Sequence, residues 1–182
     1  MQTSQLLRQQ NIAEFLIYMW QIEDLLRALN LDIDQVKSQY LVRFSDLDAQ
    51  QMRETEEWYA NLIEMMRSEK ITQSGHLQIC HNVIINLTDL HRSLLNSQKF
   101  PYYKAAYHEA LPLIVELRAK QGHSDDYNEL ESCFELLYGV MLLKMQQRPV
   151  SEETQQALGK ISTFIAMLSD YYHKTLIEPL DL

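Results

Sequence analysis

Histidines and carboxylates at helical spacing are the residues of this chain that could hold a metal ion. A di-iron carboxylate site in a helical bundle needs Glu-x-x-His on two helices and a glutamate from each of two others. The sequence contains no Glu-x-x-His, and the nearest match is Asp170 with His173. An acid and a base near the end of a helix commonly lie at the surface, so we interpret this pair as exposed residues and not as metal ligands.

A second group could hold a softer ion. His76 and Cys80 lie four residues apart, with His81 beside them, so an imidazole and a thiolate could share zinc. Two ligands are too few, because a structural zinc site needs about four. Cys80 and Cys133 both fall at apolar positions of helices, so we expect two buried, reduced thiols and no bound cofactor. A zinc role for His76 and Cys80 stays open.

His91 and His108 are the histidines most suited to a pocket. His91 lies on an apolar helix face between two leucines, and a buried imidazole without a hydrogen bond costs about 1 to 3 kcal/mol. We expect it to be a core residue bonded to Thr55 or to a tyrosine hydroxyl. Pro112 removes the N–H that would bond the His108 carbonyl, which predicts a bend in the helix and a free acceptor there.

Two glycines also interrupt predicted helices. Glycine inside a helix costs about 1 kcal/mol relative to alanine, so Gly139 and Gly159 need a reason to be there. We expect a neighbouring helix or an inserted side chain to approach the backbone closely at both positions. The candidate pocket therefore comprises His91, His108, Pro112, Gly139 and Gly159.

Aromatic residues gather near the predicted helix ends, often as neighbours in sequence. Adjacent residues on a helix point about 100° apart, so at least one of each pair should lie away from the core. Tyrosine and tryptophan commonly anchor protein interfaces. The sequence therefore predicts a partner interface formed by Trp20, Trp58, Tyr102, Tyr103, Tyr107 and Tyr171. The alternative, that these rings cover the seams between adjacent helices, stays open.

Motifs for covalent catalysis and for phosphate binding are missing from the sequence. The chain has no G-x-S-x-G elbow, and its four glycines are too scattered for a phosphate-binding loop. The sequence therefore favours a protein that is not an enzyme.

Helices are the elements that must position all of these residues. Only four glycines and four prolines occur in 182 residues, whereas ordinary usage would give about twenty. Apolar residues recur at alternating steps of three and four, which is the period of a helix face and not of a strand. The pattern predicts six long helices and one short helix over 32–42. Short connections make neighbours antiparallel, so we expect an all-α, single-domain, up-and-down helical bundle over residues 1–182.

Capping residues predict where several of these helices begin and end. Ser45, with Asp48 three residues later, resembles a capping box that begins the next helix. Gly122 is expected to end a long helix, and Ser124 and Ser151 are expected to cap the last two helices.

Charge and hydropathy limit the partners of the chain. Its net charge of −9 would repel a phosphate backbone, and no run of basic residues is longer than two, so nucleic acid is not expected. The apolar run Phe15–Trp20 has six residues, far short of the about 20 needed to span a bilayer. No membrane association and no secretory signal are expected, which places the protein in the cytoplasm.

Three segments of the chain resemble a known family. They are NIAEFLIYMWQIEDLLRAL (Asn11–Leu29), LTDLHRSLL and ALGKISTFIAML, so the similarity extends over nearly the whole sequence. The family consists of small, uncharacterised bacterial proteins with a domain of unknown function. The resemblance implies a cytoplasmic bacterial protein of similar length, and it assigns no activity, cofactor or functional residue.

Two functions from different classes remain open on the sequence alone. The favoured one is a non-catalytic protein interaction or scaffold protein that associates with itself through an aromatic helix face. The alternative is a helical bundle that binds a small molecule or a metal, with or without catalysis, and uses His91, His108 or the pair of His76 and Cys80.

Overall fold

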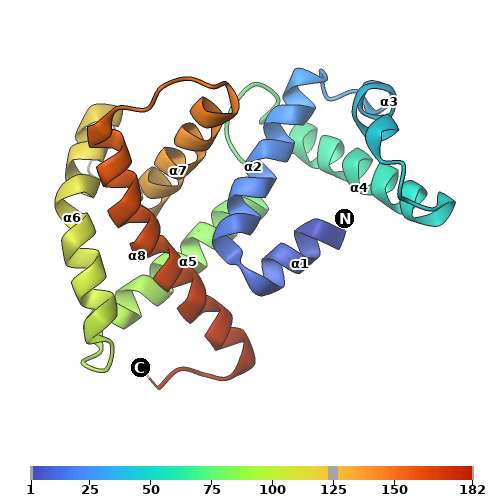
Figure 1. The fold of residues 1–182 in the computed structure, drawn as a ribbon. Helices are drawn as coiled ribbons and strands as arrows, with labels where there is room; N and C mark the ends of the chain where they lie inside the picture. The colour runs from blue at the N-terminus through green and yellow to red at the C-terminus, as the bar shows by residue number, and fades with distance from the viewer. Residues whose placement is uncertain (1, 123–126, 182) are drawn as a thin grey trace.

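The structure is a computed structural model, and it describes residues 2–122 and 127–181. In these residues every regular element is a helix, as the sequence predicts (Figure 1). The six long helices are α2 (Ile12–Ala28), α4 (Ala49–Ser68), α5 (Gln78–Asn96), α6 (Pro101–Gln121), α7 (Glu129–Met145) and α8 (Glu152–Ile177).

An additional helix, α1 (Gln2–Gln10), precedes them and was not predicted. Its sequence is mostly polar, with Leu6 and Leu7 as its only large apolar residues, so it has no apolar stripe. Asn11 separates it from α2: the backbone there is extended, and the side chain accepts a hydrogen bond from the Glu14 N–H. This cap begins α2, and the chain turns between the two helices.

The predicted short helix forms, and its backbone changes from α-helical to π-helical and then to 3-10 geometry along the segment. Asp32 caps α3 (Ile33–Gln35), which continues as a π-helical segment, η1 (Val36–Tyr40), and then as a 3-10 turn, η2 (Leu41–Arg43). The segment begins after a turn in which Asn30 and Leu31 both have positive φ, at 56° and 55°.

Two predicted helix starts are wrong or displaced. The capping box of α4 is formed by Asp48 with Gln51, because the Asp48 carboxylate accepts from the Gln51 N–H and the Gln51 side chain accepts from the Asp48 N–H. Ser45 does not cap the helix and bonds Asp46 instead. Asn128 caps α7, whereas Ser124 lies outside the described residues.

Two other predicted helix ends are confirmed. The Ser151 hydroxyl accepts from the Thr154 N–H at the start of α8. Gly122 ends α6 with φ at 71°, the left-handed conformation that glycine adopts without strain.

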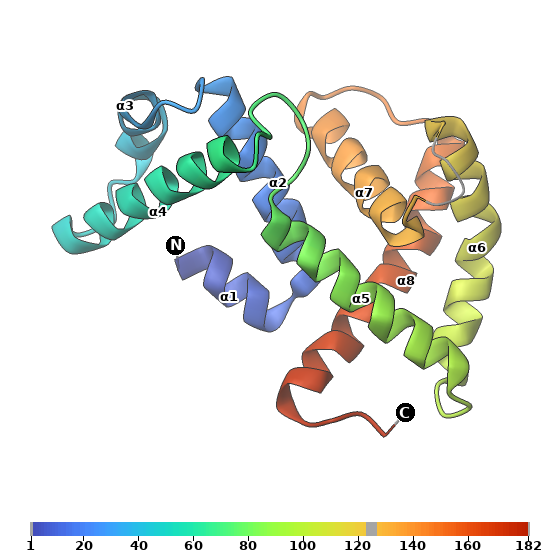
Figure 2. The ribbon, with the colours of Figure 1, turned by 180° about the vertical axis from the view of Figure 1, so that it is seen from behind.

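The long helices share one hydrophobic core, which makes the chain a single domain. Helix α8 packs against α2, α5, α6 and α7, whereas α4 lies to one side of this group, beside α3 (Figures 1 and 2). Each long helix contributes a buried side chain to the core: Leu16, Ile63, Ile84, Ile114, Phe134 and Phe164. Among the described helices, none is long and apolar enough to span a membrane.

Candidate functional site

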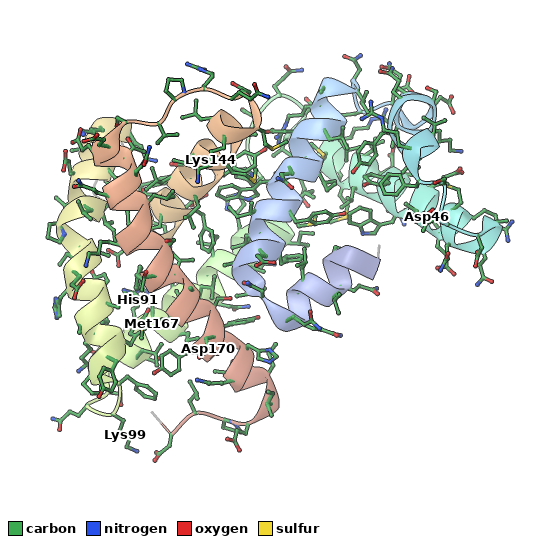
Figure 3. All side chains as sticks on the ribbon, in the orientation of Figure 1. Asp46, His91, Lys99, Lys144, Met167 and Asp170 are labelled. Atoms are coloured by element: carbon green, nitrogen blue, oxygen red, sulfur yellow. The ribbon has the colours of Figure 1, made fainter. Side chains whose placement is uncertain are left out.

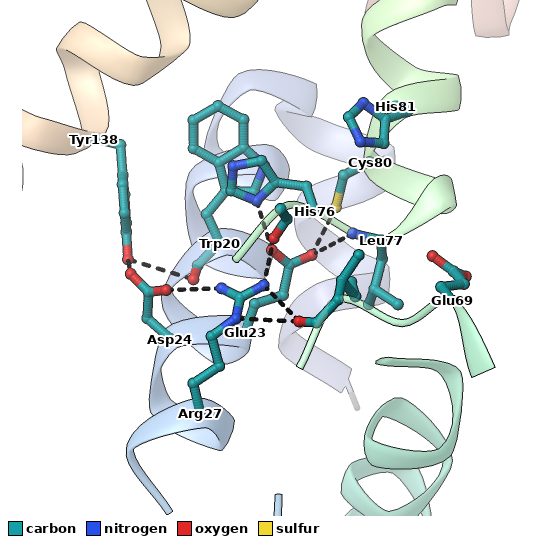
Figure 4. Close-up of polar contacts among 12 residues, drawn as sticks. Trp20, Glu23, Asp24, Arg27, Glu69, His76, Leu77, Cys80, His81 and Tyr138 are labelled. Atoms are coloured by element: carbon teal, nitrogen blue, oxygen red, sulfur yellow. Dashed lines mark hydrogen bonds and ion pairs between the residues drawn. The ribbon is translucent and has the colours of Figure 1, made fainter. Parts of the chain in front are cut away.

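A buried glutamate on α2 is the most unusual polar residue of the core (Figure 4). The Glu23 side chain is completely buried, and its Oε1 accepts the Leu77 N–H at 2.9 Å. Leu77 immediately precedes α5 and has no capping side chain of its own. Glu23 therefore supplies from α2 the acceptor that the start of α5 lacks, at the positive end of that helix dipole.

His76 completes this arrangement. Its Nδ1 lies 2.6 Å from Glu23 Oε2, and its ring stacks on the buried Trp20 ring at 4.0 Å between centroids. Arg27, one turn after Glu23, donates to the carbonyl oxygens of Ile71 and Gly75. Trp20, Glu23 and Arg27 of α2 thus hold the connection from α4 to α5, as Figure 4 shows.

Cys80 is buried and contacts the same carboxylate. Its Sγ lies 3.6 Å from Glu23 Oε1. Burial, followed by the charge of Glu23, raises the pKa of the Cys80 thiol far above its ordinary value. Burial likewise raises the pKa of Cys133, and both cysteines are free and buried, as predicted. A thiol that stays protonated is a poor nucleophile.

His76 and Cys80 therefore meet at a carboxylate. Within the described residues no group of three or more histidines, cysteines and carboxylates could hold a metal ion. Asp170 and His173 are also separate: Asp170 pairs with Lys174 at 2.7 Å, and His173 Nδ1 lies 2.7 Å from the Gln9 carbonyl oxygen.

A second buried network surrounds His91, which lies close to α8 in Figure 3. The His91 Nδ1 is 2.6 Å from the Tyr103 hydroxyl, and its Nε2 is 3.1 Å from Glu129 Oε1. The Tyr107 hydroxyl donates to Glu129 Oε2 at 3.3 Å. The predicted tyrosine partner of His91 is confirmed. Both ring nitrogens have a hydrogen-bond partner, which explains how this histidine can be buried in the core.

The electrostatics of this network follow from burial and pairing. The hydrogen bond from His91 lowers the pKa of Glu129 below its ordinary value, and Tyr107 contributes to the same shift. Burial and the neighbouring Glu129 raise the pKa of Tyr107 to about 12, and the same causes raise that of Tyr103. The carboxylate is therefore charged near neutral pH, and the two hydroxyls stay protonated as donors.

The five predicted pocket residues do not form one pocket. His91 is buried in its network, whereas His108, Pro112 and Gly159 are exposed, and α6 continues through Pro112 to Gln121. A Cβ atom placed on Gly139 or Gly159 would meet no atom within 4 Å. The expected close approach of a neighbouring helix is therefore wrong at both glycines.

The six predicted interface residues divide into two groups. Trp20 and Tyr103 are buried in the core, which removes them from any surface. Trp58, Tyr107 and Tyr171 are half-buried, and Tyr102 is 81% exposed. The centroid of the Tyr171 ring lies 5.2 Å from that of Phe100 and 5.8 Å from that of Tyr103. Tyr171 therefore covers a seam between helices, as the alternative interpretation of these aromatic residues expects.

Two apolar grooves open on the surface of the described residues. The first, the α2–α8 groove, has a volume of about 500 Å³ and is lined by Leu7, Asn11, Ala13, Glu14, Ile17, Tyr18, Gln21, Leu137, Ser162, Ile165 and Ala166. The second, the Gly139 groove, has a volume of about 480 Å³ and lies between α6, α7 and the start of α8. The two grooves have no lining residue in common.

Sequence reasoning missed Glu23 and the α2–α8 groove, whereas Gly139, one of the five predicted pocket residues, does line a groove. Glu23 follows Met19 by four residues and precedes Leu26 by three, so the helical period already places a charged residue on the apolar face of α2. A charged residue on an apolar helix face is unusual, and this could have identified Glu23 from the sequence. The α2–α8 groove had no such signal, since it arises between helices that are distant in sequence.

Comparison with known sequences identifies the family of the chain. No curated protein and no solved structure is found to match it. The family model described as "Domain of unknown function (DUF4924)" matches residues 1–178, which is nearly the whole chain. A match of this extent, over the same segments whose resemblance the sequence indicates, shows that the chain belongs to the DUF4924 family.

Proposed function

We propose that the protein is a non-catalytic interaction protein that associates with a second copy of itself through the α2–α8 groove. The observation that carries this proposal is the open apolar groove of about 500 Å³ between two long helices. Apolar surface that a chain leaves uncovered commonly marks a site of protein association.

The walls of the groove suit the approach of a helix. Ala13 and Ile17 lie one turn apart on α2, and Ser162 and Ala166 lie one turn apart on α8. The small side chains of Ala13, Ser162 and Ala166 leave room for another helix to pack closely between the walls, and Ile17 adds an apolar contact. The buried Ile165 and the half-buried Leu137 provide apolar contacts between them.

Charge does not oppose self-association at this place, although the chain as a whole has a net charge of −9. Among the described residues that line the groove, Glu14 is the only charged one. Interface cores are depleted in charged residues in this way. Two copies related by a two-fold axis would each cover the groove of the other, and two-fold dimers are the commonest homo-oligomers.

An aromatic pair adjoins the groove. Tyr18 lines it, and the Trp58 ring stacks on Tyr18 at 6.5 Å between centroids. Trp58 belongs to the predicted aromatic interface, and its position beside Tyr18 connects that prediction to this groove. A tyrosine and a tryptophan at the margin of an apolar groove are typical anchors of an interface.

Sedimentation equilibrium of three proteins tests the proposal. We expect the wild-type chain to form dimers in the micromolar range. Ala166→Arg places a long charged side chain in the groove and is expected to yield monomers. Ala105→Arg makes the same change at an exposed position of α6 and is expected to leave the dimer intact. A wild-type monomer throughout this range, or dimers of Ala166→Arg, would contradict self-association through this groove.

A further inference from the structure

The Gly139 groove has the size and lining of a small-molecule site. Its volume of about 480 Å³ lies within the range of about 300 to 1,000 Å³ that is usual for ligand pockets. Helix α6 contributes Leu117 and Gln121, and α8 contributes Thr154. The α7 residues that line it are mostly apolar: Glu135, Leu136, Gly139, Val140, Leu142 and Leu143.

Gly139 provides the open space in this groove. It lies in the middle of α7, and a Cβ atom placed there would have no neighbour within 4 Å. Glycine is therefore not needed for the packing of this chain on itself. The absence of a side chain instead leaves the α7 backbone accessible to an apolar molecule that lies against Leu136 and Leu143.

One end of the groove carries hydrogen-bond acceptors. The Gln121 Nε2 donates to Glu135 Oε2 at 2.9 Å, which fixes the orientation of the amide, because the opposite orientation would bring two acceptor oxygens together. The Gln121 Oε1 is then buried and has no hydrogen-bond partner within the described residues. A ligand that brings a donor satisfies such an acceptor, and the surrounding side chains must move to expose the buried atom to it.

We propose that the Gly139 groove binds an apolar compound that carries a primary ammonium group. The ammonium is a donor with no acceptor, so it can bond Gln121 Oε1. Its charge then faces the Glu135 carboxylate, which also accepts from Gln121 and from the Tyr127 hydroxyl at 2.7 Å. The apolar part lies along Leu136, Gly139 and Leu143. A carboxylate head would place more acceptor oxygens against these two residues. This inference is independent of self-association, because the two grooves share no residue.

Isothermal titration calorimetry with three probes of equal chain length tests the proposal. We expect octylammonium chloride to bind more tightly than 1-octanol, and sodium octanoate not to bind. Preferential binding of octanoate would place recognition at Arg148, which also lines the groove, and would overturn the proposal. The proposal is likewise overturned if none of the three probes binds.

Two variants and a matched control locate the site. Gly139→Leu fills open space on a helix, so it should fold and should weaken octylammonium binding by at least about tenfold. Gly159→Leu makes the same change at an exposed position of α8 that does not line the groove, and binding should be unchanged. Gln121→Leu should weaken binding about two- to tenfold. Wild-type affinity in Gly139→Leu or in Gln121→Leu would overturn the site, and the Ala166→Arg monomer should still bind.

Discussion

At the scale of single residues, the buried glutamate and the buried histidine of the described core each bond other groups there. Glu23 is completely buried and bonds His76 and the start of α5. His91 is buried between Tyr103 and Glu129. In both networks the polar groups bond one another across helices, so these contacts hold the helices together.

Removing the Glu23 carboxylate should be strongly destabilising. Glu23→Ala leaves the Leu77 N–H and the His76 imidazole without their acceptor inside the core, and we expect a loss of about 3 kcal/mol of unfolding free energy in urea titrations. The control is Glu64→Ala, which removes an exposed carboxylate paired with Arg67 on the surface of α4. This variant should differ from wild type by less than about 0.5 kcal/mol. Equal stability of the two variants would contradict the role of Glu23.

The Glu129 carboxylate should make stability depend on pH in the acidic range. Its pKa is lowered in the folded state from the ordinary value of 4.5, mainly by the bond from His91. The stabilisation is therefore complete above pH 4.5 and is lost as the pH falls through the lower folded pKa. Unfolding at a series of pH values should show that the stability difference between wild type and Glu129→Gln shrinks on acidification. A difference that is constant with pH would contradict this assignment.

The burial of single residues could be predicted where it follows the helical period. The period places His91, Cys80 and Cys133 on apolar faces, and all three are buried. It also places Tyr103 on an apolar face, where that ring is buried and cannot join the predicted interface. It could not show that Trp20 is buried, because which member of an aromatic pair faces the core depends on the neighbouring helices. Asp48 caps α4 in place of the predicted Ser45, because its carboxylate accepts hydrogen bonds from two N–H groups of that helix.

At the scale of elements, the four glycines divide by backbone conformation. Gly75 and Gly122 have positive φ, at 90° and 71°, whereas Gly139 and Gly159 lie within helices and have open space around them. Glycine is required at the first two positions and is a cost at the other two.

Alanine substitutions test this division. Gly139→Ala should raise the unfolding free energy by up to about 1 kcal/mol, because alanine favours the helix and meets no neighbour. Gly75→Ala should lower it by about 1 kcal/mol or more, since the added Cβ would be strained at positive φ and would lie 3.3 Å from Ile71 Cγ2. Thermal or urea unfolding of both variants measures these changes. A stabilised Gly75→Ala or a destabilised Gly139→Ala would contradict the interpretation.

Helix existence was easier to predict than helix beginnings. The six long apolar stripes each correspond to a long helix, because burying such a stripe requires a helix with that period. Helix α1 lacks a stripe and was missed, and its stability depends on packing against α2. The local sequence carries little of that information.

At the scale of the whole molecule, one core joins all six long helices, and the α2–α8 groove and the Gly139 groove lie between them. Ala13 and Ala166 face one groove from opposite ends of the chain. Each helix could be predicted alone, but a groove depends on how the helices pack together, and the sequence pattern of one helix does not contain that information.

Native mass spectrometry of freshly purified protein tests the central claim most directly, because it reports assembly, metal and retained ligand in one spectrum. The proposal predicts a main species with twice the mass of the chain, which reverts to the mass of one chain in Ala166→Arg and persists in Ala105→Arg. A wild-type spectrum that contains only single chains across the micromolar range would contradict self-association through the α2–α8 groove.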